Sequence, residues 1–141
     1  MRNFKSTTLG SLLVAAAMFS APALAEPTFV GIWYGANQPD EPGVMSLIEF
    51  LADSTFREEF RKCENGTVAG FQTESGTWTL KDGVERLNVD RLNGEPAQIE
   101  GTYTVVLLTD TERRIRMEPE GLLFVSHRVS KFEFPDCPSG V

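Results

Sequence analysis

Closely spaced turn signals constrain the fold of this chain more than any other feature of its sequence. The strongest are two-residue steps at Asn65-Gly66, Asp82-Gly83 and Asn93-Gly94. Asn-Gly and Asp-Gly steps favour tight hairpins because both residues tolerate positive φ. Further loop-forming stretches lie at residues 39–43, 52–54, 109–111 and 118–121. The chain is therefore predicted to be a succession of short elements joined by tight turns.

The segments between these turns have the composition of β-strands. β-Branched and aromatic residues dominate them, and several alternate in polarity, as where Tyr103 and Val105 share one face and Thr102 and Thr104 the other. Many short strands with Gly-rich turns predict a sandwich or an up-and-down barrel. The predicted strands are roughly 28–35, 43–51, 55–63, 67–80, 84–91, 97–108, 111–117 and 121–132.

The stretch from Thr55 to Gly66, TFREEFRKCENG, fits two secondary structures. As a helix, it would place Phe56, Phe60 and Cys63 on one stripe. As a strand, it would place Glu58 between Phe56 and Phe60 on one face. We favour the strand because the stretch lies between two other strand-like segments, and a two-turn helix would be marginal without its own packing partner.

The first 25 residues have the pattern of a cleaved export signal. Arg2 and Lys5 form a positive start, an apolar run follows from Leu9 to Phe19, and Ala23-Leu24-Ala25 is a small-residue cleavage site. The apolar run is too short to span a bilayer, so no transmembrane segment is expected. The pattern predicts a bacterial periplasmic or secreted protein whose residues 26–141 form a single domain.

Charge and cysteine content restrict the partners and the compartment of this domain. Removing Arg2 and Lys5 leaves 11 basic residues against 20 acidic ones, a net charge of −9, which argues against nucleic acid as a partner. The two cysteines, Cys63 and Cys137, both follow the export signal. An oxidising compartment makes a disulfide between them the expected arrangement.

Three short motifs resemble those of bacterial lipocalin-like domains, which belong to the wider calycin group. Gly31-Ile32-Trp33 and Gly76-Thr77-Trp78 are Gly-x-Trp motifs, and residues 50–56 read FLADSTF, with Ser54 where the family pattern has Gly. The resemblance implies an antiparallel eight-stranded up-and-down barrel. It also implies that Arg128 packs over Trp33 to close one end, a structural role that Trp78 would share.

The resemblance further implies a ligand pocket inside the barrel. Glu58 is the most informative polar position because it lies between Phe56 and Phe60 on a predicted strand face. A carboxyl group aimed inward must be paired, hydrogen-bonded or protonated. We expect Glu58, Phe56, Phe60 and Tyr103 to line a pocket for a small, partly apolar molecule, with Arg116 or Tyr103 as a partner for Glu58.

No motif in the chain predicts catalysis, a cofactor or a metal. His127 is the single histidine, and the patterns Gly-x-Ser-x-Gly and Gly-x-Gly-x-x-Gly are missing. Arg113, Arg114 and Arg116 form a basic cluster, which we interpret as charges that protect an exposed edge strand. The leading hypothesis is therefore a non-catalytic binding protein for a small hydrophobic molecule.

A second hypothesis is a periplasmic protein-interaction module, such as a small β-barrel protease inhibitor. Those inhibitors resemble this chain in size, export and a single disulfide. They place a cysteine soon after the first Trp-bearing strand, whereas Cys63 here follows Trp33 by 30 residues. A hollow barrel favours ligand binding, and a filled barrel with an exposed apolar patch favours the interaction module.

Overall fold

The structure, a computed structural model, describes residues 28–39 and 41–139. The predicted export signal, residues 1–25, lies outside this part of the chain. Within the described residues there is no helix, and so none that is long and apolar enough to cross a bilayer. The strands are β1 (Gly31–Gln38), β2 (Glu41–Phe50), β3 (Thr55–Glu64), β4 (Thr67–Lys81), β5 (Val84–Leu92), β6 (Glu95–Leu108), β7 (Glu112–Met117) and β8 (Leu123–Val129).

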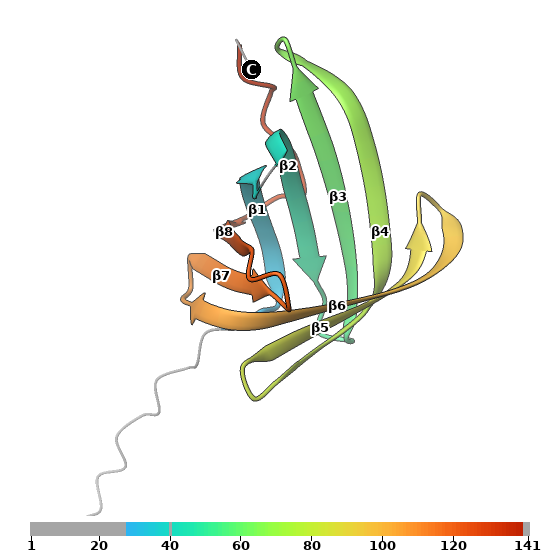
Figure 1. The fold of residues 1–141 in the computed structure, drawn as a ribbon, viewed down its shortest axis with the longest axis vertical. Helices are drawn as coiled ribbons and strands as arrows, with labels where there is room; N and C mark the ends of the chain where they lie inside the picture. Colours follow the sequence, from blue (N-terminus) through green and yellow to red (C-terminus); the bar gives the residue numbers. More distant parts are fainter. Residues whose placement is uncertain (1–27, 40, 140–141) are drawn as a thin grey trace, which may run out of the picture.

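The eight strands form a closed antiparallel barrel. Each strand pairs with the next along the chain, and β1 pairs with β8 to close the sheet (Figure 1). Closure leaves no strand of the barrel as a full-length edge. The predicted eight-stranded barrel is confirmed, and the sandwich alternative is excluded.

The predicted hairpin turns have the backbone that their sequences favour. Both residues of each two-residue turn have positive φ: Asn65 and Gly66 (52° and 76°), Asp82 and Gly83 (53° and 73°), Asn93 and Gly94 (50° and 80°). These are the values of type I′ turns, whose twist matches that of the flanking strands. The local sequence therefore sets three of the hairpin connections in the barrel.

The Thr55–Gly66 stretch forms a strand and a turn, as favoured from its sequence. Strand β3 pairs with β2 on one side and with β4 on the other. Because both edges are paired, most backbone N–H and C=O groups of the strand are hydrogen-bonded to a neighbouring strand. A two-turn helix would leave the groups at its two ends without partners. Because side chains alternate along a strand, Glu58 lies on the same inner face as Phe56 and Phe60.

Aromatic and aliphatic side chains fill one part of the barrel interior. The cluster is centred on Trp33, Phe50 and Phe56, with exposed fractions of 0–2%, and Trp78 packs against it. Trp78 stacks on the ring of Phe29 with centroids 6.2 Å apart and meets Phe50 edge-on at 5.2 Å. The two Gly-x-Trp motifs thus contribute to one continuous core.

The hairpin formed by β3 and β4 extends past the neighbouring strand. Strand β5 pairs with β4 only from Glu74 onward, so the preceding part of β4 has a partner on the β3 side alone. This extension is visible as the tall pair of strands in Figure 1. Its side chains include Val68 and Phe71, which are 51% and 71% exposed.

A disulfide fixes the segment that follows β8 to the outside of β3. Cys63 and Cys137 are bonded, with Cα atoms 5.6 Å apart, which confirms the predicted pairing. Between β8 and the disulfide, the ring of Phe132 lies 4.1 Å from the Arg57 guanidinium carbon, and the ring of Phe134 lies 4.5 Å from that of Arg61. The segment is therefore held on β3 by one covalent and two cation–π contacts.

Candidate functional site

A cavity of about 370 Å³ lies inside the barrel, next to the aromatic core. Its walls come from β2 to β8, so that residues distant in sequence meet across it. Ile48, Leu87, Val89 and Ile115 belong both to the core cluster and to the cavity wall. The volume lies within the range of small-molecule binding sites, although at its lower end.

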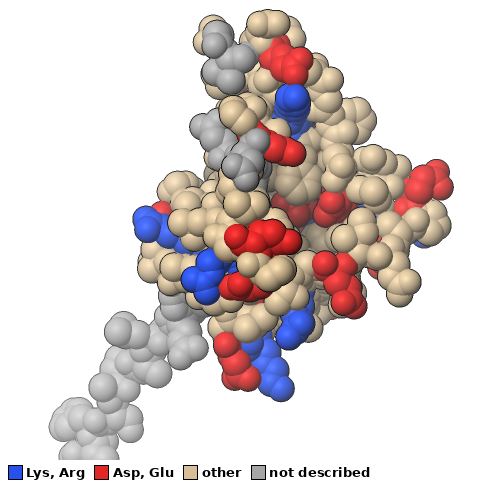
Figure 2. Space-filling model, in the orientation of Figure 1, with Lys and Arg blue, Asp and Glu red and all other residues tan. Residues whose placement is uncertain are grey.

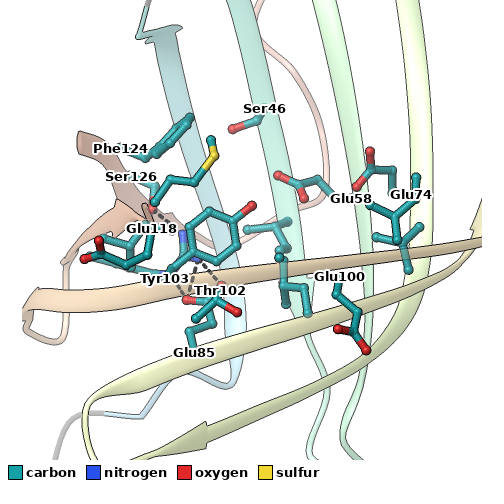
Figure 3. Close-up of a pocket in the computed structure, with 18 of the residues that line it drawn as sticks. Ser46, Glu58, Glu74, Glu85, Glu100, Thr102, Tyr103, Glu118, Phe124 and Ser126 are labelled. Carbon is teal, nitrogen blue, oxygen red and sulfur yellow. Dashed lines mark hydrogen bonds and ion pairs between the residues drawn. The ribbon is translucent and has the colours of Figure 1, made fainter. Parts of the chain in front are cut away.

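Two of the aromatic rings in the cavity wall pack against each other. Tyr103 on β6 meets Phe124 on β8 edge-on, with ring centroids 6.3 Å apart. Both rings line the cavity. Burial raises the pKa of the Tyr103 hydroxyl, so that this group stays protonated near neutral pH and can donate a hydrogen bond. In the close-up view the hydroxyl points toward Glu58 (Figure 3).

The polar part of the wall is strongly acidic. Arg113 is the sole basic residue in the described part of the chain that lines the cavity. The acidic lining residues are Glu58, Glu74, Glu85, Glu100, Glu118 and Glu120. In the space-filling view, acidic side chains lie around and within the hollow on this face (Figure 2). Such a lining disfavours anionic ligands.

Arg113 and Glu85 form a buried ion pair. The Arg113 Nη2 atom donates to Glu85 Oε1 and Oε2 at 2.7 and 2.8 Å, and Nη1 donates to the Ser126 hydroxyl at 3.3 Å. The guanidinium also lies over the rings of Phe29 and Phe50, at 5.1 and 5.2 Å. Desolvation raises the pKa of Glu85, and the Arg113 charge opposes that rise. All of these contacts hold the guanidinium in place.

Glu58 and Glu74 lie directly opposite each other on β3 and β4. Gln72 Nε2 donates to Glu74 Oε1 at 2.8 Å. Among the described residues, no side chain donates a hydrogen bond to the Glu58 carboxyl. Desolvation raises the pKa of Glu58 to about 8, with a further rise from the Glu74 charge and an opposing effect from Arg113. Glu58 is thus mainly protonated at neutral pH.

The structure separates the four residues that were predicted to bind a ligand. Glu58, Phe60 and Tyr103 line the cavity. Phe56 does not line it, and this part of the prediction is wrong: its register places it opposite Phe50 and Gly76, inside the aromatic core. Of the two partners expected for Glu58, Arg116 is excluded because it points outward and bonds Glu118 at 2.9 Å, whereas Tyr103 lies in the cavity wall.

The interpretation of the arginine cluster as an exposed edge is wrong. Strand β7 is paired on both sides, with β6 and β8. Arg114 is exposed and bonds Glu112 at 2.9 Å, whereas Arg113 points into the barrel. The missed signal was parity: Arg113 alternates in step with Ile115 and Met117, which share its inner face. Glu85 shares a face with Leu87 and Val89 in the same way.

Arg128 packs over Trp33 in the arrangement that the lipocalin resemblance implies. The Arg128 guanidinium carbon lies 4.3 Å from the centroid of the Trp33 ring. Its nitrogens donate to the backbone carbonyls of Thr28, Val30 and Asp110 at 2.7–2.8 Å. A Cβ atom at Gly31 would lie 2.1 Å from Arg128 Nη1, so the glycine of this Gly-x-Trp motif leaves room for the guanidinium.

The second Gly-x-Trp motif has a different steric basis. A Cβ atom at Gly76 would lie 1.8 Å from the backbone oxygen of Asn88 on the adjacent strand. Gly76 also adjoins an irregularity in the pairing of β4 with β5. Trp78 then donates from its indole nitrogen to the backbone oxygen of Leu51 at 3.1 Å. The motif therefore allows close strand approach and anchors the β2–β3 loop.

His127 is an exposed residue of β8, 4.0 Å from Glu112. In residues 28–39 and 41–139, no group of three or more His, Cys, Asp or Glu side chains is arranged to hold a metal ion.

Comparison with protein-family models finds no match to this chain, and comparison with curated proteins finds none either.

Proposed function

We propose that the protein is an exported lipocalin-like barrel that binds a small, partly apolar molecule without transforming it. The observation that carries the proposal is the cavity of about 370 Å³, which combines an apolar wall with a few inward-facing polar groups. Binding sites of this kind take affinity from burial of the ligand's apolar surface and orientation from the polar groups.

The assignment to the lipocalin-like type is supported by the packing at the closed end of the barrel. Arg128 covers Trp33, and Gly31 leaves the space in which the guanidinium lies. Export to the periplasm or medium is supported by the bond between Cys63 and Cys137, because structural disulfides persist in oxidising compartments.

The proposal is tested by titrating ¹⁵N-labelled residues 26–141 with a neutral naphthalene probe, 2-(1-naphthyl)ethanol, in an NMR experiment. We expect saturable shifts at cavity residues such as Leu87, Tyr103 and Phe124, and none at Phe71, which is exposed outside the cavity. Shifts confined to Phe71 and its neighbours, or no saturable shift, would overturn the proposal.

Native mass spectrometry of protein purified from its own cells provides a second test of the same proposal. A small molecule that remains bound under gentle ionisation, and is displaced by 2-(1-naphthyl)ethanol, would support occupancy of the cavity. A bound molecule that the probe leaves in place would contradict it, because both are expected to occupy the same space.

A protein-interaction module is the second candidate, and the β3–β4 extension favours it. Val68 and Phe71 are exposed there, on a part of β4 that pairs with β3 alone. A strand with one unpaired edge and apolar side chains can accept a strand from another protein along that edge. This candidate predicts a stoichiometric protein partner that is lost on Phe71→Ser and retained on Phe124→Leu.

A further inference from the structure

Two carboxyl groups face each other across adjacent strands inside the barrel. Glu58 on β3 is the direct cross-strand neighbour of Glu74 on β4, and both line the cavity. Side chains at directly opposite positions have Cβ atoms about 4.5–5.5 Å apart, and like charges there are destabilising. In Figure 3 the two carboxyl groups lie side by side at the cavity.

No cation of the described chain is bonded to this pair. Arg113 is the basic residue of the cavity wall, and its donors are directed to Glu85 and Ser126. Glu74 accepts one hydrogen bond from the neutral amide of Gln72. Glu58 accepts none from the described residues and keeps an accessible surface on the cavity. The pair is thus a carboxyl site without its own counter-ion.

The surroundings of the pair fit one end of an amphipathic molecule. Leu87, Val89 and Phe124 form apolar wall, and Tyr103 offers both a ring and a hydroxyl. Three further acidic residues, Glu100, Glu118 and Glu120, belong to the same lining. A positively charged ligand would therefore meet a favourable potential along the wall as well as at the pair.

We propose that the ligand of this cavity is an organic cation, a protonated amine attached to an apolar body, and that Glu58 and Glu74 bind its ammonium group. This inference rests on the proposed function and specifies its ligand class. An ammonium group carries three donors and no acceptor, which suits two facing carboxylates. A bare metal ion fits less well, because the described residues offer no third ligand of the usual kind.

Binding of such a cation is coupled to release of a proton. The groups that face Glu58 are Glu74 on β4, Glu85 on β5, Tyr103 on β6 and Arg113 on β7, and β2 contributes only the uncharged Ser46 and Ile48. Burial and the neighbouring carboxylates raise the Glu58 pKa to about 8. The ammonium charge favours the carboxylate, so the Glu58 proton passes to the buffer when the cation binds.

The test compares two probes that share one apolar body, 2-(1-naphthyl)ethylamine and 2-(1-naphthyl)ethanol, by isothermal titration calorimetry at pH 7. A charge-assisted contact of about 1.5–3 kcal/mol corresponds to roughly 10- to 150-fold in affinity. We expect the amine to bind at least about tenfold more tightly than the alcohol. Its affinity should also rise, by up to about tenfold per pH unit, between pH 6 and pH 8, while the alcohol shows no such rise.

Glu58→Gln keeps the size of the side chain and should remove both the amine preference and its pH dependence. The matched control is Glu59→Gln, on the outer face of the same strand, where Glu59 bonds Arg61 at 3.1 Å. Glu59→Gln should leave the affinities for both probes, and the pH dependence of amine binding, unchanged. The wild-type comparison gives an independent readout if Glu58→Gln does not fold.

The outcomes separate this inference from the proposed function. Equal binding of amine and alcohol would overturn the inference and leave the proposed function standing. An amine preference that survives in folded Glu58→Gln would also overturn it. Failure of both probes to bind would overturn the proposed function and the inference together.

Discussion

Arg113 on β7 reaches past β6 to form a bidentate ion pair with Glu85 on β5. The two hydrogen bonds from Nη2 are 2.7 and 2.8 Å long, and the side chains are 6% and 0% exposed. The pair joins strands that are not neighbours in the sheet. The pair therefore links β5 and β7 through the barrel interior and fixes the position of the Arg113 guanidinium in the cavity wall.

Replacing Arg113 with Met should strongly destabilise the protein, because Glu85 would be left buried without a counter-ion. Removal of one partner of a buried pair costs about 3–5 kcal/mol. Urea unfolding at pH 7 measures the change. Arg114→Met on the same strand, where the arginine is exposed, should change the free energy of unfolding by less than about 1 kcal/mol. Equal effects of the two variants would show that the pair does not stabilise the fold.

Glu58 should make the ligand-free protein less stable as pH rises. Its pKa is about 8 in the folded chain and near 4.5 when unfolded, so between these values the native state holds a proton that the unfolded state has lost. The free energy of unfolding then falls with pH by up to about 1.4 kcal/mol per unit. Unfolding curves between pH 5 and pH 9 should show this slope in wild type and in Glu59→Gln, and a flatter one in Glu58→Gln.

Arg128→Lys should destabilise the barrel although it keeps the charge. A lysine cannot reproduce the planar group that lies over Trp33 and donates to three backbone carbonyls. We expect a loss of about 1.5–3 kcal/mol and a change in the near-ultraviolet circular dichroism of Trp33. Arg114→Lys serves as the matched exposed control, and an equally small effect of both substitutions would contradict the prediction.

Reduction of the Cys63–Cys137 bond should lower the free energy of unfolding, but the barrel should stay folded in the absence of urea. The bond joins residues 74 positions apart, for which the chain-entropy relation gives about 4.5 kcal/mol as an upper value. Cys137→Ser should unfold at a lower urea concentration than wild type, and at the same concentration as wild type under reductant. A further drop on adding reductant to Cys137→Ser would indicate an effect other than loss of this bond.

Gly76→Ala should be far more damaging than Gly70→Ala, although both glycines lie on β4. An added Cβ would lie 1.8 Å from the Asn88 oxygen at position 76 and would meet nothing within 4 Å at position 70. We expect a loss of about 3 kcal/mol or more for Gly76→Ala, because the neighbouring backbone must move. Thermal unfolding followed by far-ultraviolet circular dichroism compares the two, and similar midpoints would exclude a steric role for Gly76.

The sequence predicts those features of this fold that depend on neighbouring residues. Asn65-Gly66, Asp82-Gly83 and Asn93-Gly94 specify hairpin turns because their residues tolerate positive φ. The succession of strands along the chain therefore follows from turn sequences. The Cys63–Cys137 bond was predictable because only one pairing is available. Glu58 was found because its polarity interrupts an apolar face.

The sequence does not specify which residues meet across the barrel. The irregular pairing between Val105 and Leu107 shifts the inward face of β6, so that Leu108 rather than Leu107 packs on the core. Phe56 lies in the core instead of the cavity because the register of β3 with β2 and β4 places it beside Phe50 and Gly76. Glu85 and Arg113 could be given inward faces from their parity, but their contact depends on closure of the sheet.

Closure of β1 against β8 determines when this chain can acquire its structure. Until β8 has been synthesised, β1 has an open edge and the indole of Trp33 lacks the guanidinium that covers it. Pairings between such distant segments form late and slowly. The barrel can therefore close only after Leu123–Val129, the last of its strands, has been synthesised.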